Sequence, residues 1–296
     1  MAIVREFEFK TGKGGKAVTI GQITDAHINT VNSYDMQDAE IADSFAHRKW
    51  GAGGTHIPKF CYALEYCKDF DRIILTGDIL DYYSSASKNI LAGAFERYKN
   101  VIACIGGHEL TLEMETDNVN VRSLRDRYTL LEEFWCNDIH YYSEILEGKV
   151  TVILLDNNTE LWMEQKEMFD EDQYRRLAND IESARNHGRI ILMFMHEAIY
   201  SGKSETVTDL FDGKVYELRM VLPQEGTFSR KAYDLIVSSS DVIKGIFFGH
   251  EHSDFDIDIQ AGFYKNGEYV NCNIPAHCLT SNSLGNEEHI VKITVD

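Results

Sequence analysis

Residues 72–81 read RIILTGDILD, a short β-branched run that ends in a glycine and two aspartates. The run Arg72–Thr76 is too short for a typical helix and is rich in isoleucine, which favours a buried strand. Gly77 breaks the strand, so Asp78 and Asp81 stand just past its carboxyl end. The pattern predicts a buried strand with two carboxylate side chains just past its carboxyl end.

Five other segments repeat this pattern of a short apolar run and are also expected to be buried strands. They are Ala17–Thr24, Val101–Ile105, Val150–Leu155, Arg189–Met195 and Val242–Phe248. Longer stretches with helical spacing lie between them, such as Lys59–Phe70 and Asp170–His187. In the second stretch Asp170 and Gln173 can form a capping box, and Gly188 can end the helix. Alternating strands and helices predict an α/β fold class.

The rest of the chain gives no sign of a second domain. Only three prolines occur in 296 residues, and there is no Pro-rich or Gly/Ser-rich linker. We expect a single domain over 1–296, in which 28–57 is either a polar surface excursion or a specificity loop over the site. AsnGly at 266–267 predicts a hairpin, and 289–295 a final strand.

The charge of the chain restricts its partners. Acidic side chains outnumber basic ones by 48 to 29, giving a net charge of −19. This excess repels a polyanion, so a long nucleic acid is not an expected partner, whereas a small phosphorylated substrate held by a metal is compatible. No window is apolar enough for a membrane span, and MAIVREFEFK at 1–10 lacks a signal-peptide core, so we expect a cytoplasmic protein.

Aspartate and histidine residues follow the ends of five predicted strands. They are Asp25 and His27, Asp78 and Asp81, His108, His196, and His250 and His252. In an open α/β sheet the ligand crevice lies beyond the carboxyl ends of the strands, so we expect these residues to converge. Burying so many imidazoles and carboxylates together is costly without a cation between them. The sequence therefore predicts a metal site.

The residue types narrow the metal and the chemistry. The set contains aspartate and histidine but no thiolate, which favours Mn, Fe or Zn in a catalytic rather than a structural site. It is too large for one catalytic ion with open positions, but it suffices for two ions bridged by a carboxylate. Such a pair suits in-line displacement at phosphorus.

The ordered motifs resemble the signature of the calcineurin-like metallophosphoesterases: DxH, GDxxD, GNH[D/E], a lone His and GHxH. Here they read DAH at 25–27, GDILD at 77–81, GGHE at 106–109, MHE at 195–197 and GHEH at 249–252. The resemblance spans about residues 17–260. It implies a four-layer α/β/β/α sandwich with two divalent or trivalent metal ions at the C-terminal ends of the strands.

The resemblance also implies a role for each matching residue. Asp25, His27 and His252 would bind the first ion, and His196 and His250 the second. Asp78 would bridge the two ions. His108 would be the catalytic histidine, oriented by Asp81, and Glu109 would support it.

One position departs from the family pattern. Gly107 stands where the family has an asparagine that gives an oxygen to the second metal, so we expect the second site to hold its ion less tightly. Water, Glu109, Asn157 or Asn158 could replace the missing oxygen, and the sequence does not choose among them.

The expected activity is therefore hydrolysis of a phosphodiester, in a small nucleotide or another soluble diester, with a metal-bridging hydroxide as the nucleophile. No phosphate-binding arginine is obvious near the motifs, which favours a diester over a dianionic monoester. A phosphomonoesterase is the alternative enzyme. A catalytically weakened metal-binding scaffold is the alternative from another class, because Gly107 replaces the family asparagine.

Overall fold

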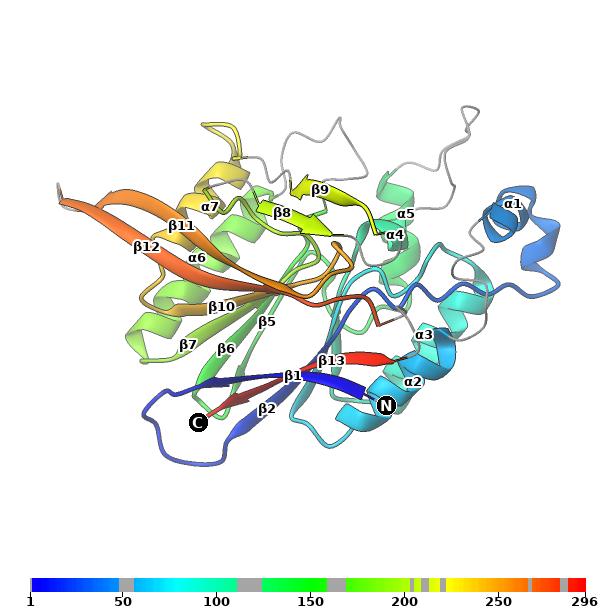
Figure 1. Ribbon diagram of the computed structural model, residues 1–296, viewed down its shortest axis with the longest axis horizontal. Coiled ribbons are helices and arrows are strands. Elements are labelled where there is room, and N and C mark those ends of the chain that lie inside the picture. Colours follow the sequence, from blue (N-terminus) through cyan, green and yellow to red (C-terminus); the bar gives the residue numbers. More distant parts are fainter. Residues whose placement is uncertain are drawn as a thin grey trace.

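The computed structural model describes residues 2–47, 56–110, 124–158, 169–202, 205–208, 213–218, 222–265, 268–282 and 287–296. Two β-sheets face one another, and helices cover their outer sides (Figure 1). The fold is therefore α/β, as the alternation of strands and helices predicts. None of the described helices is long and apolar enough to cross a membrane.

The first sheet has the strand order β1-β13-β2-β3-β4. Its strands are β1 Ala2–Phe9, β13 Glu288–Val295, β2 Val18–Ile23, β3 Arg72–Thr76 and β4 Val101–Cys104. Strands β2, β3 and β4 are mutually parallel, so their carboxyl ends lie at one edge. That edge carries the first three motifs.

The second sheet has the order β11-β12-β10-β7-β6-β5. Its strands are β11 Phe255–Lys265, β12 Glu268–Cys278, β10 Ile243–Phe248, β7 Ile190–Phe194, β6 Val150–Leu155 and β5 Tyr141–Leu146. Strands β6, β7 and β10 are parallel, and the last two motifs follow β7 and β10. A separate hairpin pairs β8 Glu205–Thr208 with β9 Val215–Leu218.

Side chains alternate between the faces of each strand and build three apolar cores. In β3, Ile74 packs toward the second sheet, whereas Ile73 and Leu75 pack toward helices. Between the sheets, the ring of Phe247 stacks on Phe194 with centroids 5.2 Å apart. The outer cores lie under helices on either side. This burial holds the two motif-bearing edges in place.

The helices are short and connect successive strands. They are α1 Ala39–His47, α2 His56–Cys67, α3 Ser85–Arg97, α4 Gly107–Leu110, α5 Leu124–Glu132, α6 Glu171–Asn186 and α7 Phe228–Val237, with a 3-10 turn η1 at Asp35–Gln37. The capping box at α6 forms as expected: Gln173 N–H donates to the Asp170 side chain, and the Gln173 side chain accepts from Asp170 N–H.

Most predicted elements match within a few residues, with two differences. The helix expected at Lys59–Phe70 begins earlier, at His56, and ends at Cys67. The alternating N-terminal segment forms the edge strand β1, which is not among the predicted elements. The predicted AsnGly turn at 266–267 lies outside the described residues, but β11 and β12 on either side of it pair in antiparallel fashion.

The described part of the 28–57 segment is not a bare loop. It contains η1 and α1, and residues 48–55 lie outside the described residues. The buried Asp35 carboxylate accepts hydrogen bonds from the backbone N–H groups of Ser85 and Ala86 at 2.8 and 3.0 Å. Because these groups begin α3, the segment is fixed to the end of that helix.

Candidate dinuclear metal centre

Three predicted ligands of the first ion meet beyond the ends of β2 and β10. Ligand atoms of Asp25, His27 and His252 all lie within 4.8 Å of one another. The Nε2 atoms of His27 and His252 are 3.1 Å apart, and Oδ1 of Asp25 lies 3.5 Å from His252 Nε2. Convergent imidazole and carboxylate atoms at these spacings form a donor set suited to one cation.

The predicted ligands of the second ion form a matching cluster beyond β3, β7 and β10. Asp78, His196 and His250 again offer atoms within 4.8 Å of one another. Nε2 of His196 lies 3.1 Å from Asp78 Oδ2 and 3.3 Å from His250 Nδ1. The two clusters therefore have the same residue chemistry.

Asp78 belongs to the second cluster and also lies next to a ligand of the first. It also groups with His27 and His108, whose ligand atoms fall within 4.8 Å of it. Because His27 belongs to the first cluster and His196 to the second, the Asp78 carboxylate is near ligands of both. This is the position that a bridging carboxylate requires.

The backbone is strained where these side chains attach. Among the described residues, six non-glycine residues have positive φ, and five of them are predicted ligands: Asp25, His27, Asp78, His250 and His252. Non-glycine residues rarely adopt this conformation, and such strain clusters at functional sites. The surrounding fold thus holds these residues in a strained conformation at the point where their side chains converge.

Two motif glycines leave room for the ligand carboxylates. A Cβ at Gly106 would overlap the side chain of Asp78, and a Cβ at Gly249 would overlap those of Thr24 and Asp25. The glycines in the third and fifth motifs are therefore explained by close approach of the chain to a carboxylate.

The electrostatics favour the metal-binding forms of Asp78 and His27, whereas the Asp78 carboxylate outweighs burial at His196 and holds the pKa of that imidazole well above its usual value. Burial disfavours the charged form of Asp78, but the imidazoles of His196 and His108 outweigh it and hold the pKa of Asp78 well below its usual range. Burial lowers the pKa of His27 to about 4, which leaves its imidazole neutral near pH 7. Ionised carboxylate and neutral imidazole are the forms that bind metals.

His108 lies at the rim of the centre, partly exposed. Its Nδ1 donates to the backbone carbonyl of Asp81 at 2.9 Å, and the Asp81 carboxylate lies 3.3 Å from the same atom. Both contacts favour a proton on Nδ1, so Nε2 faces Asp78 Oδ2 at 3.9 Å. The predicted orientation by Asp81 thus includes the backbone carbonyl of Asp81 as well as its side chain.

The Asp81 carboxylate also contacts His27, and other residues fix the Asp81 side chain. Its Oδ1 lies 3.3 Å from His27 Nδ1, and its Oδ2 accepts from Asn29 Nδ2 at 2.9 Å. The Asn29 side chain accepts from the hydroxyl of Tyr82. No pattern in the sequence indicates a positioning role for Asn29, because nothing in the spacing places its amide behind Asp81. Such outer partners fix the orientation of metal ligands.

Glu109 is fully buried and supports the backbone of two motifs. Its two oxygens accept from the N–H groups of Asp78, Ile79, Leu80 and Gly106 at 2.6–2.9 Å. Burial and the nearby Asp78 carboxylate raise the pKa of Glu109 to about 7. Glu109 therefore joins the turn after β3 to the turn after β4.

The β8–β9 hairpin contacts the last motif. The hydroxyl of Tyr216 in β9 donates to the carboxylate of Glu251, a buried residue that stands between His250 and His252 in the sequence. The hairpin therefore lies against the last motif, and the spacing of the motifs does not reveal the contact made by Tyr216.

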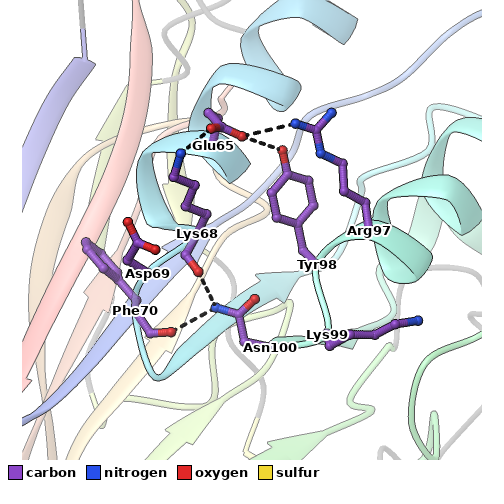
Figure 2. Close-up of a pocket in the computed structure, with 8 residues that line it drawn as sticks. All are labelled: Glu65, Lys68, Asp69, Phe70, Arg97, Tyr98, Lys99 and Asn100. Carbon is purple, nitrogen blue, oxygen red and sulfur yellow. Dashed lines mark hydrogen bonds and ion pairs between the residues drawn. The ribbon is translucent and has the colours of Figure 1, made fainter.

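A surface hollow at the other end of the first sheet has different chemistry (Figure 2). In its lining, Glu65 accepts hydrogen bonds from Lys68 at 2.5 Å and from Tyr98 at 3.0 Å. Asn100 in its lining directly precedes β4, so the hollow lies at the amino ends of the strands. The candidate centre lies at the carboxyl ends.

Comparisons with known proteins identify the family of this chain. The family model of the calcineurin-like phosphoesterases matches residues 18–254. A protein of Fibrobacter succinogenes (strain ATCC 19169 / S85) named as a probable cyclic nucleotide phosphodiesterase is 24% identical over 252 residues, covering 83% of this chain and 77% of its own.

Solved structures of low identity are also similar. A dimetal phosphatase from Danio rerio has a TM-score of 0.49 at 12% identity, with 89% of this chain and 87% of that chain covered. The calcineurin-like phosphoesterase YfkN from Bacillus subtilis has a TM-score of 0.41 at 14% identity, with 90% and 82% covered. Since the family model covers most of the sequence and its motifs, this chain belongs to the calcineurin-like phosphoesterase family of metal-dependent phosphoester hydrolases.

Proposed function

We propose that this chain is a dinuclear-metal phosphodiesterase that hydrolyses a small soluble diester such as a cyclic nucleotide. One observation carries the proposal. Two Asp/His clusters lie side by side with Asp78 near ligands of both, and His108 stands at their rim. This is the arrangement that suits in-line displacement at phosphorus.

The residues present fit two ions. Asp25, His27 and His252 would hold one ion and His196 and His250 the other, with Asp78 shared. When bound, two such ions supply a nucleophile at neutral pH and neutralise charge on the phosphoryl oxygens.

His108 acts on the leaving group in this proposal. Because its Nδ1 is held by the carbonyl of Asp81, the ring can hold and release a proton only at Nε2, on the side of the centre. A departing alkoxide that accepts this proton leaves as an alcohol. Asp81 fixes the ring and is a positioning residue.

A diester is favoured over a monoester by charge. None of the five motifs contains Lys or Arg, and Glu109, Glu197 and Glu251 stand within or beside them. A dianionic monoester requires more cationic compensation than a monoanionic diester does. The name of the Fibrobacter succinogenes relative also supports a cyclic nucleotide as the first substrate to test.

The test is turnover of bis(p-nitrophenyl) phosphate by the purified chain with added Mn²⁺. We expect the wild type to release p-nitrophenol. In His108→Ala the turnover rate should fall about 10²–10⁴-fold, which is the usual contribution of a general acid or base. His187→Ala is the matched control, since His187 is exposed at the end of α6, and it should keep full activity.

The substrate class is tested with a panel of cyclic nucleotides beside p-nitrophenyl phosphate. Faster turnover of the monoester would contradict the diesterase proposal and leave a phosphomonoesterase. A chain that binds its ions but turns over neither class with Mn, Fe or Zn would be a metal-binding scaffold.

A further inference from the structure

The side-chain amide of Asn158 is buried just past the end of β6, in a fixed orientation. Its Nδ2 donates to the backbone carbonyl of Ile105 at 3.0 Å and to Oδ1 of Asp156 at 2.8 Å. Both partners are acceptors, so the nitrogen must lie on this side and the amide cannot be flipped. Oδ1 of Asn158 therefore lies on the other side.

This oxygen is an acceptor that the described part of the chain leaves unsatisfied. Oδ1 of Asn158 is inaccessible to solvent, and no described residue donates a hydrogen bond to it. Buried amide oxygens are nearly always satisfied, because removing them from water without a partner is costly. An oxygen in this state is a ready ligand for a cation.

Asn158 lies beside the position where the family asparagine is missing. The carbonyl that it binds belongs to Ile105, two residues before Gly107. Its neighbour Asn157 is bound to Glu197, which directly follows the ligand His196. The pair thus stands between the turn after β4, which contains Gly107, and the turn after β7, which contains His196.

The side-chain oxygens of the two other residues that could replace the missing one already accept hydrogen bonds. Asn157 donates from Nδ2 to the carbonyl of Glu197 at 2.7 Å and accepts from the Glu197 N–H at 3.2 Å. Each oxygen of Glu109 accepts two backbone N–H groups. Of the three, only Asn158 has a buried oxygen with no hydrogen bond from a described residue.

We propose that Oδ1 of Asn158 supplies the second metal ion with the neutral amide oxygen that Gly107 cannot give. The inference rests on the proposed dinuclear centre. Asp156 positions the amide, because its Oδ1 binds Asn158 while its Oδ2 accepts from the hydroxyl of Tyr128 at 2.6 Å. The oxygen thus comes from the loop after β6 instead of the loop after β4.

The test is calorimetric titration of the metal-free chain with Mn²⁺, together with electron paramagnetic resonance of the exchange-coupled Mn pair. The variants are Asn158→Ala, Gly107→Asn and the double variant. We expect Asn158→Ala to weaken the second ion by more than about tenfold and to leave the first ion unchanged. Asn137→Ala is the matched control, because the Asn137 amide is bound to the backbone of Ala103 on both sides.

Rescue separates a ligand role from a loss of structure. In the double variant, Gly107→Asn restores the family oxygen and should recover second-ion affinity, whereas a misfolded chain would not recover. Equal second-ion affinity in Asn158→Ala and the wild type, or equal weakening of both ions without rescue, overturns the role of Asn158. A wild type that binds a single ion overturns the dinuclear centre itself, and this proposal with it.

Discussion

The Nε2 atoms of His27 and His252 face each other at 3.1 Å, although 225 positions separate the two residues in the sequence. They lie at the ends of strands from different sheets, so each sheet contributes ligands to the first cluster. Any change that shifts one sheet relative to the other would separate them.

His252→Ala should weaken the first ion more than the second, because it removes a ligand of the first cluster only. We expect the affinity for the first ion to fall at least about tenfold. Even the loss of a residue that only orients a ligand costs about this much affinity. Calorimetric titration with Mn²⁺ measures it, with His187→Ala as the control. Selective loss of the second ion instead would show that the ligand sets are assigned to the wrong ions.

Gly106→Ala should disrupt the centre through a steric clash with the Asp78 carboxylate. We expect destabilisation of about 1–3 kcal/mol from overpacking and weaker binding of both ions. Gly93→Ala is the paired control, since a Cβ at Gly93 in α3 meets no atom within 4 Å and should stabilise the helix by about 0.5–1 kcal/mol. Thermal melts measure the stability of both variants, and metal titrations measure their affinity for the ions. Equal stability and equal affinity in the two variants would contradict the steric clash.

Glu109→Gln should lower the free energy of unfolding by about 1–3 kcal/mol, because the new amide nitrogen must face backbone N–H donors. Urea unfolding of the metal-free chain measures the loss. Glu133→Gln is the control, because Glu133 directly follows α5 and its side chain is exposed. This variant should change the free energy of unfolding little. A Glu109→Gln variant as stable as the wild type would mean that Glu109 does not hold the two turns together.

His140 should titrate above its ordinary value. Its hydrogen bond with Asp156 is the largest cause, and it raises the pKa of His140 although burial opposes it. The pairing therefore adds stability that is complete below about pH 6.5, the value in the unfolded chain, and is lost as pH rises through the folded pKa.

His140→Gln should consequently cost more stability at pH 5.5 than at pH 8.5. Urea unfolding at both pH values in the presence of a chelator measures this difference, and proton NMR of the ring gives the pKa directly. If His140→Gln lowered the free energy of unfolding equally at both pH values, the proposed ion pair between His140 and Asp156 would be wrong.

Phe247→Ala should cost about 3–5 kcal/mol, because the ring fills the core between the two sheets against Phe194 and Phe7. Ile145→Ala, at a half-exposed position on the edge strand β5, should change stability by less than about 0.5 kcal/mol. Denaturant unfolding compares the two. Similar losses would mean that the inter-sheet core is not the main source of stability.

The sequence predicts the elements that have strong local signals. Short isoleucine-rich runs such as Arg72–Thr76 and the Asp170–Gln173 capping box are local, and the structure contains both within a residue of the expected bounds. The approach of the predicted site residues to one another follows from the rule that parallel strands present their carboxyl ends together. The roles given to these residues remain predictions.

Features that depend on long-range pairing are less visible in the sequence. The order of strands places β13 between β1 and β2, and no local pattern indicates that partnership. The placement of Asn29 behind Asp81 and of Tyr216 against Glu251 likewise depends on how distant loops meet. Physical proximity of this kind is set by the whole fold.

The place of β13 has a consequence for biosynthesis. Residues 288–295 form the strand that joins β1 at positions 2–9 to β2 at positions 18–23. As the chain leaves the ribosome, β1 has no hydrogen-bonding partner in the sheet until residues 288–295 have been synthesised. During that interval the edge of β2 that later pairs with β13 is open to other nascent chains, so we expect chaperones to protect the chain until β13 has formed.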